Sequence, residues 1–389
     1  MGFLSASTSI CYFQVKGAED YHQNNDEQIR NNLAAEAFRS IEQSADELST
    51  GWVEFGDEDS GDFATPHSCW RDHYLCFSLR QDRRRVPAAL LKRHFAHLCG
   101  QFLAAHPTYH RVPKSQREQL RDQAREVLLA RTLPTPSVVN LIWDTRRHLI
   151  RFCSLGKNSL DSFQSLFHQT FPGLRLHLLA PLERANQVLP QELQTALSSA
   201  NQAQSDSTLE LIEANRWLGT DFFFWLFYRT LNTDSLYGVN ISGPLLEKQP
   251  FHAFLDNRLV LVGGGQEGIQ RIVVAGPQDQ FLEVKAALSQ AKQIEEATIH
   301  LRQDDDRAWK LTLKGERFAF GNLLTPMLRP ETDPQSDPVA EAEAAFLTKI
   351  AAVEEAEQLF DSLLKSFLEV RLSESWSAEM KKITGWLKE

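Results

Sequence analysis

The chain has no uninterrupted apolar stretch near the roughly 18 residues that a membrane-spanning helix requires. Its most apolar run, residues 222–228, is bounded by Asp221 and Arg229. The 389 residues include five cysteines, an odd and scattered set that favours reduced thiols over a disulfide framework. The first residues carry no basic stretch of the kind that opens a secretory signal. These features predict a soluble, cytoplasmic protein.

Internal repeats and low-complexity tracts are also missing, which excludes solenoid and fibrous architectures. A length of 389 residues allows two or three domains of about 100–200 residues each. Short alternating runs interspersed with helical apolar stripes predict an α+β fold, with mixed or antiparallel sheets flanked by helices. We predict an α+β region over 1–185, a second with an aromatic-rich helix and hairpins over 186–325, and a Pro-rich linker with C-terminal helices over 326–389.

Several helices are predicted from spacing. Apolar residues recur at helical intervals over 29–48 and over 209–231, and a long amphipathic helix is expected over 339–370. Pro87 suits the first position of a helix that carries an apolar stripe to Phe102. Ser115 and Glu118 have the spacing of a capping box, which predicts a helix from there to about Arg131.

Charge is distributed very unevenly along the chain. The net charge is −10, yet residues 71–151 hold 16 Lys and Arg against 6 Asp and Glu. The rest of the chain therefore has a net charge of −20. Contact with a polyanion is a local matter, because exposed charges further apart than about 10 Å are largely screened at 0.1 M salt. The basic segment therefore predicts a nucleic-acid partner despite the acidic total.

The basic segment contains three clusters, at a strand-to-helix turn, on the capped helix and at a hairpin turn. Phosphate recognition needs cations spread along a surface, without depending on any one side chain. Glu118, Asp122 and Glu126 run beside the arginines of the capped helix, so an intrahelical ladder of ion pairs is the alternative. The predicted DNA-contacting residues are Arg83, Arg84, Arg85, Lys92, Arg93, Lys114, Arg117, Arg121, Arg125, Arg146 and Arg147.

Two patterns could indicate a cofactor or metal, and neither predicts one. His67, Cys69, His73 and Cys76 are zinc-ligand types, but their spacing matches no compact finger. The glycine-rich stretch 262–268 precedes a β-branched run, which favours a hairpin turn over a phosphate-binding loop.

Two acidic clusters could supply carboxylates to a magnesium-dependent nuclease. They are Asp57, Glu58, Asp59 and Asp62, and separately residues 304–306. Both have the composition of exposed turns, and no spaced acidic partners lie on neighbouring predicted strands. No enzymatic activity is predicted.

Four segments resemble the bacterial RdgC family of recombination-associated DNA-binding proteins. They are Gly51–Val53, the helix Lys114–Leu129, Leu141–Asp144 and Leu178–Leu182, together with the order of elements between them. The resemblance covers about residues 51–182, and weakens beyond them. It implies an α+β subunit of crescent shape, two of which close into a ring around duplex DNA without sequence preference.

The resemblance also implies a basic inner surface, which falls on residues 83–85, Lys92, Arg93, Lys114, Arg117, Arg121 and Arg125. It further implies a homodimer, a nucleoid-associated location and a functional relation to RecA-type recombinases. The chain departs from the family in its extra length after Leu182 and in the segment Leu133–Ser137, which looks shortened where the family carries an aromatic gate loop. The alternatives are a magnesium-dependent nuclease on the same scaffold and a protein-interaction module without direct DNA contact.

Overall fold

The computed structural model describes residues 2–17, 25–44, 46–205, 207–265, 268–276, 281–326 and 337–388. The chain forms two compact units. The large unit comprises Met1–Lys16, Arg146–Lys157 and Arg175–Glu389, and the small unit comprises Gly17–Thr145 and Asn158–Leu174. The predicted boundaries at 185 and 325 do not coincide with the edges of these units.

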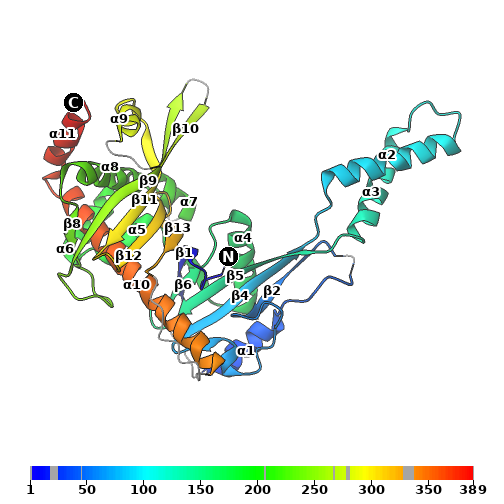
Figure 1. The fold of residues 1–389 in the computed structure, drawn as a ribbon, viewed down its shortest axis with the longest axis horizontal. Coiled ribbons are helices and arrows are strands. Elements are labelled where there is room, and N and C mark those ends of the chain that lie inside the picture. The colour runs from blue at the N-terminus through cyan, green and yellow to red at the C-terminus, as the bar shows by residue number, and fades with distance from the viewer. Residues whose placement is uncertain are drawn as a thin grey trace. The chain divides into compact units, whose positions relative to one another are not determined.

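The small unit is built on an antiparallel sheet in which β4 (Tyr74–Arg83) pairs with three other strands. These are β2 (Leu48–Glu54), β3 (Trp70–Arg71) and β5 (Thr135–Asp144). Helix α1 (Asp26–Ala35) and the turn η2 (Pro66–Ser68) precede β2 and β3, and α4 (Lys157–Thr170) belongs to this unit except for its first residue. Helices α2 (Ala88–Ala105) and α3 (Lys114–Leu129) connect β4 to β5 and extend beyond the ends of those strands (Figure 1).

Aromatic side chains form the core of the small unit between its sheet and α4. Trp52 packs edge-on against Phe77, and its indole N–H donates to Thr170 Oγ1 at 2.6 Å. Gly51 lies where the chain at Phe38 passes closest, and a Cβ at position 51 would stand 2.4 Å from Phe38 Cα. The Gly51–Trp52 pattern in the sequence therefore reflects a close backbone approach beside a buried indole.

In the large unit, antiparallel strands lie in the order β10-β9-β11-β12-β13-β1-β6. Strand β7 pairs with β1, and β8 pairs with β9. The strands are β1 (Ser7–Lys16), β6 (Leu149–Phe152), β7 (Arg175–Leu178), β8 (Leu236–Gly238), β9 (Pro250–Gly265), β10 (Gly268–Ala275), β11 (Gln293–Arg302), β12 (Ala308–Lys314) and β13 (Ala319–Leu324).

Seven helices complete the large unit among the described residues. They are α5 (Pro181–Val188), α6 (Gln191–Ala200), α7 (Thr208–Ala214), α8 (Trp217–Asn232), α9 (Leu282–Ser289), α10 (Pro338–Arg371) and α11 (Trp376–Trp386). Phe222 of α8 packs edge-on against Phe360 of α10, and Phe360 packs edge-on against Phe320 of β13, so aromatic contacts join both helices to the sheet. The Trp309 indole of β12 donates to the Ala352 carbonyl of α10 at 2.8 Å. Many apolar side chains of α8 and of the long helix α10 are buried, so both helices contribute to the core.

The α+β fold class with antiparallel sheets and a helical C-terminal segment is confirmed. Two predicted helices differ in extent. The helix expected over 29–48 ends at Ala35, and the helix expected over 209–231 is broken between α7 and α8. The Asn215 side chain causes that break, because its amide donates to Asn201 Oδ1 and the Leu211 carbonyl while its oxygen accepts the Trp217 indole N–H.

The linker predicted from residue 326 lies mostly outside the described residues, as do two residues of the glycine-rich stretch. The described part of that stretch forms a hairpin, with Gly265 opposite Gly268, as predicted. Among the helices that the structure describes, none combines the length and apolarity needed to cross a bilayer.

Candidate nucleic-acid interface

Helices α2 and α3 and the loop between them, residues 88–129, form a two-helix projection that we call the arm (Figure 1). The arm carries seven Lys and Arg against three Asp and Glu. None of the residues of α2, all of which are described, is buried, and only Ala124 and Leu129 of α3 are. The arm is therefore a cationic surface with little core of its own. Its exposed predicted residues are Lys92, Arg93, Lys114, Arg117, Arg121 and Arg125.

A groove of about 450 Å³ runs between the two helices of the arm. Ala88, Leu91 and Phe95 of α2 line it from one helix. Four cationic side chains border it, and Glu118 is the only acidic residue among the described residues that line it. These cations are Lys92, Lys114, Arg117 and Arg121. The structure thus gathers four of the predicted contact residues around one groove.

The arginines of α3 are not held in an intrahelical ladder. Within the described chain, no ion pair joins Arg117 or Arg121 to an acidic residue. Arg125 pairs with Glu47 at 2.7 Å, outside the helix, and both side chains are about half exposed. An exposed pair of this kind contributes little stability, about 0–1 kcal/mol. The cations that border the groove therefore remain open to an external anion.

Arg84 is a correction to the predicted set. Its side chain is 5% exposed, and its guanidinium donates to carbonyl oxygens of two separate loops. The acceptors are Leu129, Thr132, Ile41, Glu42 and Ser44. A guanidinium committed in this way cannot reach a phosphate, so Arg84 fastens the base of the arm to the preceding loop.

Arg83 and Arg85 flank Arg84 and are exposed, at the junction between β4 and α2. Arg146 and Arg147 are exposed too, but they belong to the large unit. Arg147 lies 3.7 Å from the Glu357 carboxylate. Arg151, which closes the basic segment of the sequence, is fully buried in an ion pair with Glu357. The exposed cations of the small unit thus form the principal candidate surface.

The candidate zinc ligands do not form a metal site. Among the described residues, no group of three or more His, Cys, Asp and Glu side chains converges in a way that could hold a metal ion. Cys69 and Cys76 are fully buried, and burial raises the pKa of the Cys69 thiol to about 12. A thiol of that kind stays protonated at neutral pH, which disfavours nucleophilic reactivity.

Carboxylates of the first acidic cluster accept hydrogen bonds within their own loop. Asp57 Oδ1 accepts the Asp59 N–H, and Asp62 Oδ1 accepts the Ala64 N–H. Asp59 pairs with Arg80 at 2.6 Å. Hydrogen bonds with Asp82 raise the pKa of that arginine well above its ordinary value. These carboxylates stabilise turns and a strand end.

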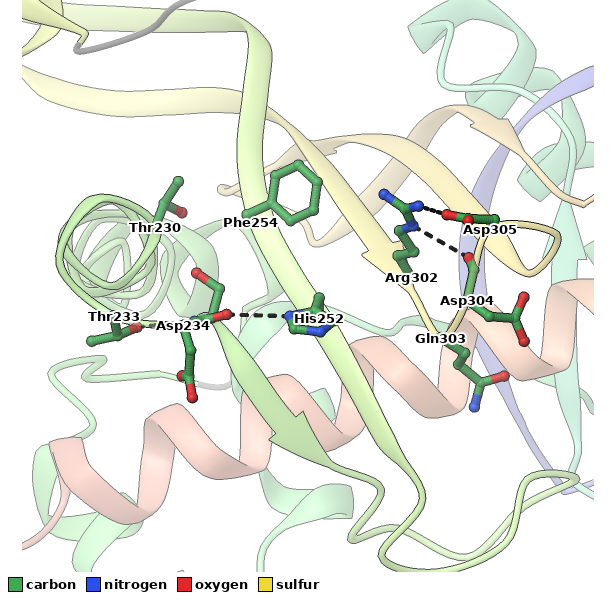
Figure 2. A pocket seen from close by; sticks show the side chains of 10 residues that line it. Thr230, Thr233, Asp234, His252, Phe254, Arg302, Gln303, Asp304 and Asp305 are labelled. Carbon is green, nitrogen blue, oxygen red and sulfur yellow. Dashed lines mark hydrogen bonds and ion pairs between the residues drawn. The ribbon is translucent and has the colours of Figure 1, made fainter.

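The second acidic cluster borders an open pocket of about 600 Å³ in the large unit (Figure 2). Asp304 Oδ1 accepts the N–H groups of Asp306 and Arg307, and Asp305 forms an ion pair with Arg302. On the pocket's opposite side, the Asp234 carbonyl lies 3.2 Å from His252 Nδ1. The Asp304 and Asp305 carboxylates are thus engaged by their own turn and by Arg302, and they are not arranged as a pair of metal ligands.

The chain matches the family model described as "Putative exonuclease, RdgC" over residues 10–216, more than half of its length. The chain belongs to the RdgC family. At family level, this makes it a recombination-associated DNA-binding protein, as the four segments of the sequence had indicated. The match extends across both the arm and the strands that support it. No curated protein matches the chain.

One feature of this RdgC protein was not predicted from the sequence: an aromatic ring lies among the cations of the groove. The Arg117 guanidinium lies over the Phe95 ring, 5.7 Å from its centroid, within the range of a cation–π contact. The two residues are 22 positions apart and lie on different helices. Only a comparison of the apolar stripe of α2 with the arginine row of α3 could have suggested the pairing.

Proposed function

We propose that this protein binds duplex DNA through the phosphate backbone, without sequence preference and without enzymatic activity, and that it modulates homologous recombination. Family membership supports DNA binding in a recombination context. The observation that carries the proposal is the exposed cationic arm, whose groove arginines have no acidic partner within the described chain. Such an array meets phosphates wherever they occur along a duplex, which explains binding to any sequence.

The acidic remainder of the chain does not oppose this function. The arm's cations extend along α3 from Lys114 to Arg125, about 17 Å at 1.5 Å per residue. Carboxylates beyond about one Debye length, near 8 Å at physiological salt, are largely screened from a phosphate held there. The acidic surface elsewhere would instead discourage DNA from binding outside the arm.

We also propose that the protein acts as a homodimer. Strand β10 ends the order of the large sheet, and of its described neighbours only β9 pairs with it. Seven of its eight residues are exposed, and Ile269 and Val273 are 85% and 52% exposed. An unpaired apolar edge is suited to antiparallel pairing with the same strand of a second copy, because a two-fold axis makes the pairing reciprocal. A ring would require a second contact, for which Leu133, 75% exposed, offers an apolar side chain.

A salt titration of duplex binding tests this function. Fluorescence anisotropy with two unrelated 30-base-pair duplexes should give equal affinities and a steep, linear fall of log K with log salt. The mass of the free protein, measured by light scattering, should be that of a dimer. Failure to bind at low salt would remove the proposal and favour a protein-interaction module.

The same duplexes, labelled at one end and incubated with protein and Mg²⁺, test the nuclease alternative. Shortened products that disappear with EDTA would establish nuclease activity. We expect full-length DNA at the end of the incubation.

A further inference from the structure

The floor of the arm groove carries apolar and aromatic side chains that binding to the duplex backbone does not use. Leu91 and Phe95 are partly exposed within it, although a cationic rim surrounds them. A base-paired duplex presents phosphates and sugars on its outside and keeps the faces of its bases stacked. An aromatic ring set among phosphate-binding cations therefore contributes little to a duplex held only by its backbone.

Unpaired nucleotides fit both parts of the groove. Proteins that bind single strands combine a positive groove that follows the backbone with aromatic rings on which bases stack. Lys114, Arg117 and Arg121 follow one another at intervals of three and four residues along α3, so they present a row of donors on one side. Phe95 faces this row from α2, with the Arg117 guanidinium near its ring.

We propose that the arm groove is a subsite for an unpaired base, which stacks on Phe95 while its flanking phosphates bind Lys92, Lys114, Arg117 and Arg121. The proposal rests on the proposed DNA binding and deepens it. The arm would then favour DNA with locally open strands over fully paired duplex.

An acidic peptide with a bulky apolar side chain is the other occupant that this groove could accept. Two observations favour nucleic acid. The exposed cations continue beyond the groove to Arg93 and Arg125 on the arm and to Arg83 and Arg85 at its base, as a polyphosphate requires and a short peptide does not. Phe95 on the floor of the groove also presents an aromatic ring beside the Arg117 guanidinium, and this arrangement suits a planar π system such as a nucleobase.

The test compares a 30-base-pair duplex with the same duplex carrying six unpaired thymines at its centre. The intact protein should bind the second DNA more tightly at matched salt. Phe95→Leu keeps an apolar side chain but removes the aromatic face, and we expect it to lower affinity for the unpaired DNA by about fivefold or more. Its affinity for the duplex should stay within about twofold of the original.

Phe95→Trp is the matched variant, because it keeps an aromatic face and should preserve the preference. Retained duplex binding by Phe95→Leu also shows that the arm remains folded. Equal affinities of the intact protein for both DNAs, or a preference that survives in Phe95→Leu, would overturn the subsite while leaving duplex binding intact. Binding of an acidic phenylalanine-containing peptide in the groove, with no preference for unpaired DNA, would overturn it in favour of a protein partner. No binding to either DNA would instead remove the proposed function itself.

Discussion

The Arg151 guanidinium and the Glu357 carboxylate share two hydrogen bonds of 2.7 Å each, and both side chains are buried. The pair joins β6 to α10 across the core of the large unit. Removing one member of a buried pair leaves an uncompensated charge, which costs about 3–5 kcal/mol. Arg151→Met should therefore lower the free energy of unfolding by about that amount in urea denaturation. Arg147→Met, at a half-exposed position, should change it by less than about 1 kcal/mol.

The same pair predicts a pH dependence of stability. Burial raises the pKa of Glu357, but the charge and hydrogen bonds of Arg151, with Arg147 and Arg184 nearby, outweigh it and hold the pKa below its usual 4.5. A carboxyl with a lowered folded pKa contributes stability above its unfolded pKa, and that contribution is lost as pH falls through the folded value. Glu357→Gln should therefore be less stable than the original protein at pH 7, and the difference should shrink steadily below about pH 4.5. A constant difference from pH 7 to pH 3 would contradict this account.

Replacing Arg84 and replacing Arg85, neighbours at the base of the arm, should have different effects on stability and on duplex binding. Arg84→Ala leaves the buried carbonyls of Leu129 and Ile41, and three partly buried ones, without their donor. An unsatisfied buried acceptor costs about 1–3 kcal/mol, so we expect a loss of at least about 3 kcal/mol of unfolding free energy. Arg85→Ala removes an exposed side chain and should change stability by less than about 0.5 kcal/mol while weakening duplex binding. Urea denaturation and anisotropy on both variants separate the structural residue from the contact residue. Equal stabilities would show that Arg84 does not anchor the arm.

Loss of the groove cations should flatten the salt dependence of binding. Replacing Lys114, Arg117 and Arg121 together with alanine removes three candidate phosphate contacts. The slope of log K against log salt should decrease in magnitude by about 2–3, with similar loss of affinity for any sequence. Replacing Lys381, Lys382 and Lys388 with alanine makes the same change in net charge at exposed positions in or next to α11 and should leave the slope unaltered. If both triple variants behave alike, the total charge and not the arm controls binding.

The exposed edge of the large sheet should control self-association. Ile269→Lys combined with Val273→Lys places charge on one face of β10, which disfavours pairing with a second strand. We expect the apparent mass in light scattering to fall towards that of a monomer, while thermal unfolding of the monomer is unchanged because both side chains are exposed. Leu209→Lys combined with Leu246→Lys makes the same chemical change at exposed positions outside the strand and should leave the mass unaltered.

Local patterns in the sequence predicted most elements of the fold, because helical stripes and strand alternation reflect which side of each element is buried. They also predicted which segment carries the cations. Capping was less predictable. Ser115 and Glu118 have capping-box spacing, yet α3 begins at Lys114 with Pro113 at its N-cap and no side-chain cap.

Whether an individual arginine is buried or available to a ligand could not be predicted from its neighbours in the sequence. Arg83, Arg84 and Arg85 are alike in sequence, and only carbonyl groups 40 to 48 positions away make Arg84 a buried residue. The Arg125 partner, Glu47, is 78 positions distant, and the Phe95–Arg117 contact joins two helices. Such long-range contacts decide whether a charge is available to a ligand, and a one-dimensional pattern does not record them.

The absence of any buried side chain on α2, a helix described throughout its length, has a consequence for how the arm behaves in time. A helix with no fully buried side chain opens locally at a low free-energy cost, so its amide protons should exchange with solvent much faster than those of β4. A polyanion that binds both α2 and α3 would hold the two helices together and stabilise the arm. Binding of this polyanion should then slow amide exchange throughout the arm, including at residues whose side chains do not contact it.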